Sequence, residues 1–127
     1  APDVDSIRLI GHVPDQSIYV GQEEEVTAEA IVFDADQDEL DLTWEILTEG
    51  DYRNTFGGDK EQRPIVIPDL IQKQEGNRLT FISPQRVGAY RLFVYARDGH
   101  GNYASGNISF YVSNKRITSL AAMQTAQ

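Results

Sequence analysis

Three aspartates at alternate positions, Asp34, Asp36 and Asp38, stand directly before a strand-like run that carries the chain's only tryptophan. Calcium takes about 6–8 oxygen ligands, and an Asp-x-Asp-x-Asp run supplies several of them from one turn. Together with Glu45, the spacing imitates the ligand positions of an EF-hand loop. The sixth position of that loop needs glycine for its sharp bend, and here it is Glu39, so the sequence does not encode an EF-hand.

A second calcium geometry is open to the same aspartates. In a β-sandwich, the turn at 34–38 and the RDGHGN turn at 97–102 can meet at one end, which lets Asp98 join the others. The alternative is a solvated turn whose aspartates accept hydrogen bonds from their own backbone, and the general preference of aspartate for turns favours it. The calcium hypothesis therefore concerns a structural ion with these ligands: Asp34, Asp36, Asp38 and Asp98.

Two strand-like stretches near the C-terminus, AYRLFVYAR and NISFYVS, carry aromatic residues at alternate positions. Because side chains alternate between the two faces of a strand, burying one set turns Phe93, Tyr95 and Tyr111 outward, flanked by Arg91 and Arg97. Such a contiguous aromatic surface is too large to count as scattered exposed residues. It indicates either a binding surface or an interface with a neighbouring domain.

The segment 48–64, TEGDYRNTFGGDKEQRP, is longer than most loops, and loops of this length tend to be functional or disordered. Its mixture of aromatic, amide and charged side chains is suited to holding a sugar, and Tyr52 and Phe56 are its aromatic members. The alternatives are an insertion that folds over the aromatic surface and a plain surface loop.

Composition argues against several classes of function. Twenty acidic residues against eleven basic ones give a formal charge of −9, whose field repels nucleic acid and anionic lipid headgroups. No apolar run approaches the roughly 20 residues that span a bilayer. The chain has no cysteine, and its two histidines, His12 and His100, stand in turn-like stretches. We therefore expect neither nucleic-acid binding nor membrane insertion, and we predict that the protein is not an enzyme.

Alternation with a period of two predicts an all-β fold. The expected strands cover residues 6–10, 17–20, 26–33, 40–46, 65–67, 78–83, 89–97 and 107–113. A short helix is expected around Leu70 to Lys73. Seven to nine short strands with regular turns predict one Greek-key antiparallel β-sandwich over 1–114, followed by a tail at 115–127.

Three residues give the predicted sandwich an immunoglobulin-like character. Trp44 stands in an early strand, Tyr90 at the start of a late strand where a tyrosine corner belongs, and Leu92 in the position of the second cysteine. The pattern DADQDELDLTWEI followed by VGAYRLFVYARDGHGN resembles the PKD-like and immunoglobulin-like modules of bacterial extracellular proteins. The long insertion is similar to the C-terminal immunoglobulin-like module of some bacterial polysaccharide-degrading glycoside hydrolases.

The resemblance implies a secreted or cell-surface protein, extracellular or periplasmic, whose signal peptide lies outside this sequence. It also implies a carbohydrate-binding accessory module with a polysaccharide ligand, such as a β-glucan or a related plant or algal glycan. The predicted binding residues are Phe93, Tyr95, Tyr111, Arg91, Arg97, Tyr52 and Phe56. The alternatives are a spacer that packs on a neighbouring domain of the same polypeptide and a calcium-dependent cadherin-like adhesion domain.

Overall fold

The computed structural model describes residues 2–13, 16–35, 39–49 and 65–114. The period-two alternation of the sequence becomes eight β-strands, so the all-β prediction is confirmed. The strands are β1 (Pro2–Leu9), β2 (Tyr19–Gly21), β3 (Glu25–Asp34), β4 (Asp41–Thr48), β5 (Ile71–Glu75), β6 (Arg78–Ile82), β7 (Gly88–Arg97) and β8 (Tyr103–Ser113).

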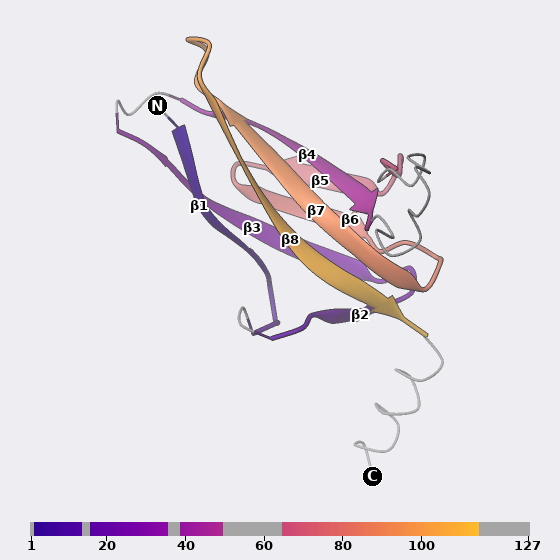
Figure 1. Ribbon diagram of the computed structural model, residues 1–127. Helices are drawn as coiled ribbons and strands as arrows, with labels where there is room; N and C mark the ends of the chain where they lie inside the picture. Colours follow the sequence, from indigo (N-terminus) through magenta and orange to yellow (C-terminus); the bar gives the residue numbers. More distant parts are fainter. Residues whose placement is uncertain (1, 14–15, 36–38, 50–64, 115–127) are drawn as a thin grey trace, which may run out of the picture.

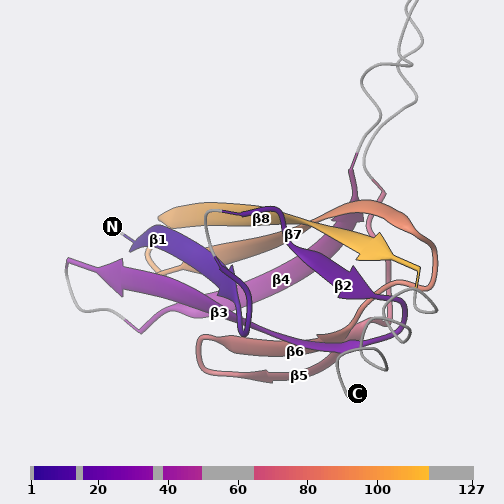
Figure 2. The same ribbon diagram turned by 90° about the horizontal axis from the view of Figure 1, so that it is seen from below.

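The strands form two four-stranded sheets that lie face to face, as Figures 1 and 2 show. One sheet has the order β1-β3-β6-β5 and the other the order β2-β8-β7-β4. Every pairing is antiparallel except that of β2 with β8, which is parallel. None of the described residues form a helix with the length and hydropathy that a membrane crossing requires.

Two of the expected elements differ from the structure. Residues 71–75 form strand β5 instead of a short helix, and all five of their side chains are exposed. An edge strand exposed on both faces has no alternation for a hydrophobic pattern to detect. The expected strand at 65–67 makes only an isolated bridge, between Val66 and Leu47 of β4.

The core lies between the two sheets and consists of the alternate residues that the pattern predicts to be buried. Trp44, Leu92 and Phe110 are each less than 5% exposed. Leu92 packs in this interior and fills its position with an apolar side chain, as expected.

Tyr90 makes the hydrogen bond of a tyrosine corner. Its hydroxyl donates to the main-chain carbonyl of Arg86 at 2.5 Å, and its ring stacks on Phe110 with the centroids 5.8 Å apart. Burial raises the pKa of the Tyr90 phenol, and the nearby charge of Arg86 opposes this shift. The corner fixes the chain where it enters β7.

The β7–β8 hairpin positions the candidate site. Arg97 ends β7 and pairs in register with two residues, Tyr103 of β8 and Asp41 of β4. The five-residue turn between the strands projects from one end of the sandwich (Figure 1). Gly99 and Gly101 have φ values of 80° and 88°, a conformation that favours glycine, so the turn can reverse the chain tightly.

Candidate functional site

Five aromatic side chains lie on the outer surface of the β2-β8-β7-β4 sheet, and we call them the aromatic face: Tyr19, Phe93, Tyr95, Tyr103 and Tyr111. Tyr103 is 73% exposed, Tyr19 59% and Tyr111 41%, whereas Phe93 and Tyr95 are half-buried. The predicted outward orientation of Phe93, Tyr95 and Tyr111 is therefore confirmed. Within the described residues, the opposite outer surface has one exposed aromatic side chain, Phe33.

Four of the five members of the aromatic face form two stacked pairs, and Tyr103 belongs to neither. Phe93 and Tyr95 are neighbours on β7, with ring centroids 6.2 Å apart and planes at 9°. Tyr111 of β8 stacks instead on Tyr19 of β2, at 5.2 Å and 23°. The face is therefore not one continuous platform, because polar residues of β7 and β8 separate the pairs.

Arg91 lies between the two pairs and is held by its neighbours. Its Nη2 lies 3.0 Å from Oε1 of Glu49, and its Nη1 donates to Oδ1 of Asn107 at 2.6 Å. These contacts occupy the guanidinium that was expected to bond a ligand. Arg91 therefore orders the middle of the face.

Tyr95 is tied to a carboxylate on the neighbouring strand. Its hydroxyl donates to Glu45 of β4. Burial is the main cause that raises the pKa of the Tyr95 phenol, and the negative charge and hydrogen bond of Glu45 raise that pKa further. Tyr95 thus presents its ring, rather than a free hydroxyl, to a partner.

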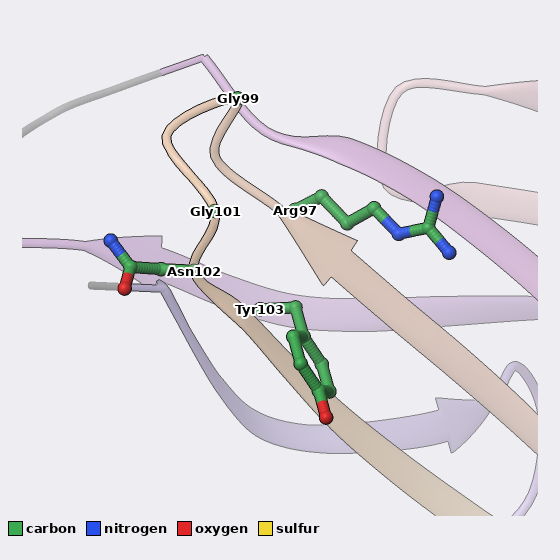
Figure 3. A pocket seen from close by; sticks show the side chains of 5 residues that line it. All are labelled: Arg97, Gly99, Gly101, Asn102 and Tyr103. Carbon is green, nitrogen blue, oxygen red and sulfur yellow. The ribbon is translucent and has the colours of Figure 1, made fainter.

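A pocket lies at the hairpin end of the face, lined by Arg97, Gly99, Gly101, Asn102 and Tyr103, with a volume of about 360 Å³. Figure 3 shows the side chains of Arg97 and Tyr103 on the same side of the hairpin, whereas Asn102 points away from them. A neighbouring hollow of about 340 Å³ also contacts Arg97 and Gly99. Its other lining residues are Glu39, Leu40, Asp41 and Asp98, so the residues that lead into β4 lie beside the hairpin turn.

Asp98 holds the hairpin turn together. Its Oδ1 accepts hydrogen bonds from the main-chain N–H of His100 at 2.7 Å and of Asn102 at 3.2 Å, and its Oδ2 accepts from Nδ2 of Asn102 at 2.9 Å. The Asn102 side chain, followed by the main-chain N–H of His100, lowers the pKa of the Asp98 carboxyl. Asp98 thus bonds the backbone of its own turn, as the alternative to calcium expected, although it is buried rather than solvated.

Of the other predicted calcium ligands, the structure describes one. Asp34 is half-buried at the end of β3, and Asp36 and Asp38 lie outside the described residues. In the described part of the chain, no three His, Cys, Asp or Glu side chains form a group that could hold a metal ion. Both oxygens of Asp98 already accept hydrogen bonds within the turn, and the prediction of structural calcium is wrong.

The sequence did not predict two members of the aromatic face, and two of the predicted carbohydrate-binding residues lie outside the described residues. Tyr103 lies on β8 an even number of residues before Tyr111, so both side chains point outward. The expected strand began at residue 107, and a longer one would have included Tyr103. Tyr19 is outward because β2 pairs with β8, a long-range contact without a local signal. Tyr52 and Phe56 of the insertion lie outside the described residues.

Comparison with known proteins found no matching family model and no matching curated protein. Two similar solved structures are those of PcoC, a methionine-rich copper resistance protein from Escherichia coli, and its selenomethionine form. The first is 16% identical with a TM-score of 0.49, and the alignment covers 88% of this chain and 98% of that one. The second is 17% identical with a TM-score of 0.48, covering 87% and 98%. At these values the likeness assigns neither a family nor a ligand to this chain.

These comparisons correct the functional predictions that came from the family resemblance. No PKD or carbohydrate-binding family model matches, and the similar structures named are copper resistance proteins rather than glycoside-hydrolase modules. The predictions of polysaccharide binding, of a spacer that packs on a neighbouring domain of the same polypeptide and of cadherin-like adhesion are therefore wrong. The physical arrangement agrees with this correction, because Arg91 is occupied and the rings form two separate pairs.

Proposed function

We propose that this chain is a non-catalytic protein-recognition module, and that the aromatic face is its binding surface. The observation that carries the proposal is the concentration of exposed tyrosine on one sheet, where Tyr19, Tyr103 and Tyr111 are 41–73% exposed. Tyrosine is enriched at protein interfaces because it combines a large apolar ring with a polar end and few rotatable bonds. Four of the chain's six tyrosines belong to the face.

Charge indicates the kind of protein that would bind. The chain carries a formal charge of −9, and Asp41 and Glu45 of β4 lie beside the aromatic rings. Complementary potentials accelerate encounter and exclude partners of like charge. The proposed partner is therefore a separate protein chain with a basic surface.

The non-catalytic part of the proposal rests on the placement of the histidines. His12 follows β1 and His100 lies in the β7–β8 turn, so neither lies among the rings of the face. We expect the purified chain to show no hydrolytic or redox turnover in activity assays. Substituting residues of the aromatic face should reduce binding to the partner.

We also propose that the sandwich is of the immunoglobulin type. The orders β1-β3-β6-β5 and β8-β7-β4 correspond to the ABED and GFC arrangement of that fold, and β2 adds a strand beside β8. The tyrosine corner at Tyr90 and the buried Trp44 support the same assignment. Location outside the cytoplasm, in the periplasm or beyond the cell, belongs to this proposal and is tested by locating the native protein in fractionated cells.

A crosslinking experiment tests the binding surface and identifies the partner. A photoreactive phenylalanine is placed at Tyr111 or Tyr103, and at Phe33 as the control, since Phe33 is an aromatic residue of the opposite sheet that is 55% exposed. We expect one basic protein to be crosslinked from Tyr111 and Tyr103 and not from Phe33. Equal yields of the same product from Phe33 would contradict the proposal.

A further inference from the structure

We propose that the pocket at the β7–β8 hairpin binds a carboxylate group. The pocket is lined by Arg97, Tyr103 and the turn between them and has a volume of about 360 Å³, enough for a group the size of one side chain (Figure 3). Three features of the described structure carry this inference: an arginine without a counter-ion, an exposed hydroxyl beside it, and open space over the turn.

Arg97 differs from three of the other arginines that the structure describes. Arg8 and Arg78 both bridge to Glu29 at 3.2 Å, and Arg91 bridges to Glu49 at 3.0 Å. Among the described residues, no ion pair or hydrogen bond joins the Arg97 guanidinium to another side chain. Its planar fork of donors is therefore available to a ligand.

Tyr103 supplies a second donor from the adjacent strand. It is the residue opposite Arg97 in the antiparallel register, so the two side chains leave the sheet on the same face. The side chain is 73% exposed, and no hydrogen bond of its hydroxyl is seen within the described part of the chain. An arginine fork and a phenol O–H side by side make a donor pair for one acceptor group.

The turn leaves room for the ligand to approach the main chain. Nothing lies within 4 Å of the positions that a side-chain carbon would take on Gly99 or Gly101. Both residues have positive φ, a backbone conformation that favours glycine. Because glycine has no side chain, the space above the turn stays empty.

A carboxylate fits these donors better than other anions do. A guanidinium binds a carboxylate through two parallel hydrogen bonds, and here one arginine is present to match one such group. The formal charge of −9 repels any anion, and a doubly charged phosphate is repelled about twice as strongly as a carboxylate. Asp41 and Asp98 in the neighbouring hollow further disfavour a ligand with a second negative charge.

The source of the carboxylate rests on the proposed function: it is an acidic side chain or the C-terminus of the partner protein. The pocket lies at one end of the aromatic face, so a bound partner chain would reach it. Arg97 would then fix the register in which a basic partner meets an acidic surface, since its charge is opposite to that of Asp41 and Asp98 nearby.

Binding is tested by nuclear magnetic resonance on the whole chain, without the partner. The probes are N-acetylglycine with a terminal carboxylate, N-acetylglutamate amide with a side-chain carboxylate, free acetate, and N-acetylglycinamide with none. We expect saturable shifts of the Arg97 Nε–H and of the Gly99 and Gly101 amides with at least one carboxylate probe and none with the amide. The probe that binds most tightly identifies the source.

Substitutions show whether Arg97 carries the binding. Arg97→Gln should raise the Kd at least tenfold, and Tyr103→Phe should raise it a few-fold, because each removes donors without removing bulk. Arg86→Gln is the matched control: Arg86 likewise makes no side-chain ion pair within the described residues, and its loss should leave the Kd within twofold. Equal binding by the wild type and Arg97→Gln, or equal shifts with N-acetylglycinamide, would overturn the inference.

The experiments distinguish failure of the carboxylate-pocket proposal from failure of the protein-recognition proposal. If no carboxylate probe binds while crosslinking from Tyr111 still captures a partner, the pocket assignment is wrong and the aromatic face stands. If carboxylates bind through Arg97 but no partner contacts Tyr111, the pocket stands and the protein-recognition proposal is wrong.

Discussion

Ser83 is a buried polar residue whose hydroxyl joins two segments distant in sequence. Its Oγ donates to the carbonyl of Gly21 at 2.5 Å and accepts from the N–H of Glu24 at 2.7 Å. The side chain is 1% exposed, so water cannot replace either bond. The hydroxyl therefore fixes the connection from β2 to β3 against the end of β6.

Replacing Ser83 tests this contribution. Ser83→Ala leaves a main-chain donor and an acceptor without their partner, and we expect the free energy of unfolding to fall by about 1–3 kcal/mol. Urea denaturation measures the change. Ser113→Ala removes a longer and more exposed bond, 3.3 Å to the carbonyl of Val20, and should cost less. Equal costs for the two variants would show that burial of the Ser83 hydroxyl is not the cause.

Asp98 gives the turn a dependence on acid. Its folded pKa is lowered, chiefly by the Asn102 side chain and then by the His100 N–H, so the folded state favours the charged carboxylate. This stabilisation is present above the unfolded pKa, near 3.8, and is lost as the pH falls through the lower folded value. We expect the wild type to melt above Asp98→Asn at pH 6 and the difference to shrink toward pH 2. A difference that stays constant with pH would contradict the assignment.

At the scale of residues, the sequence predicted which way side chains point better than it predicted whether they are free to bind a ligand. Alternation placed Phe93, Tyr95 and Tyr111 outward, because the pleat of a strand determines the face. It did not predict that Arg91 is held by Glu49, since that contact joins residues 42 positions apart. Long-range contacts of this kind have no local pattern.

At the scale of elements, Gly106 sets the distance between β8 and β1. A side-chain carbon at this position would lie 2.6 Å from Cγ1 of Val4 and 3.3 Å from its Cβ. Contacts of that length require one strand to move. Glycine is needed here for the close approach of the two strands, which belong to different sheets.

A double-mutant cycle tests the close approach. Gly106→Ala should lower the free energy of unfolding by about 1–3 kcal/mol through overpacking. Adding Val4→Ala should recover part of that loss, because it removes the atoms in collision. Ser105→Ala, on the outward side of the same strand, is the control and should change stability little. Strictly additive effects of Gly106→Ala and Val4→Ala would contradict the contact.

The strands that sequence predicted well are those with one buried face. β3, β4 and β7 alternate clearly between buried and less buried residues, and a strand was expected at each of them. β5 was missed because its five residues are exposed on both faces, and its place at the edge follows from pairing with β6. A strand can be predicted from sequence when one of its faces is buried, because burial of one face produces the alternating hydrophobic pattern.

At the scale of the whole molecule, the sandwich was predictable and its ligand was not. Eight strands in two sheets follow from alternation and turn spacing. The carbohydrate prediction depended on family resemblance, which two-sheet folds with different functions share. The calcium prediction depended on the spacing of aspartates, which turns without a metal also contain. The total charge of −9 gives the sign of the preferred partner surface but not its identity.

The central claim is that the aromatic face is where a partner protein binds, and affinity for the crosslinked partner tests it most directly. The Kd is measured by calorimetry for the wild type, Tyr111→Ala and Phe33→Ala, which truncate exposed aromatic residues on opposite sheets. We predict that Tyr111→Ala raises the Kd about tenfold or more, since truncation of a central interface tyrosine costs more than about 1 kcal/mol. Phe33→Ala should leave the Kd within about twofold, because residues away from an interface contribute little to affinity. An unchanged Kd for Tyr111→Ala, or an equal loss for Phe33→Ala, would contradict the claim.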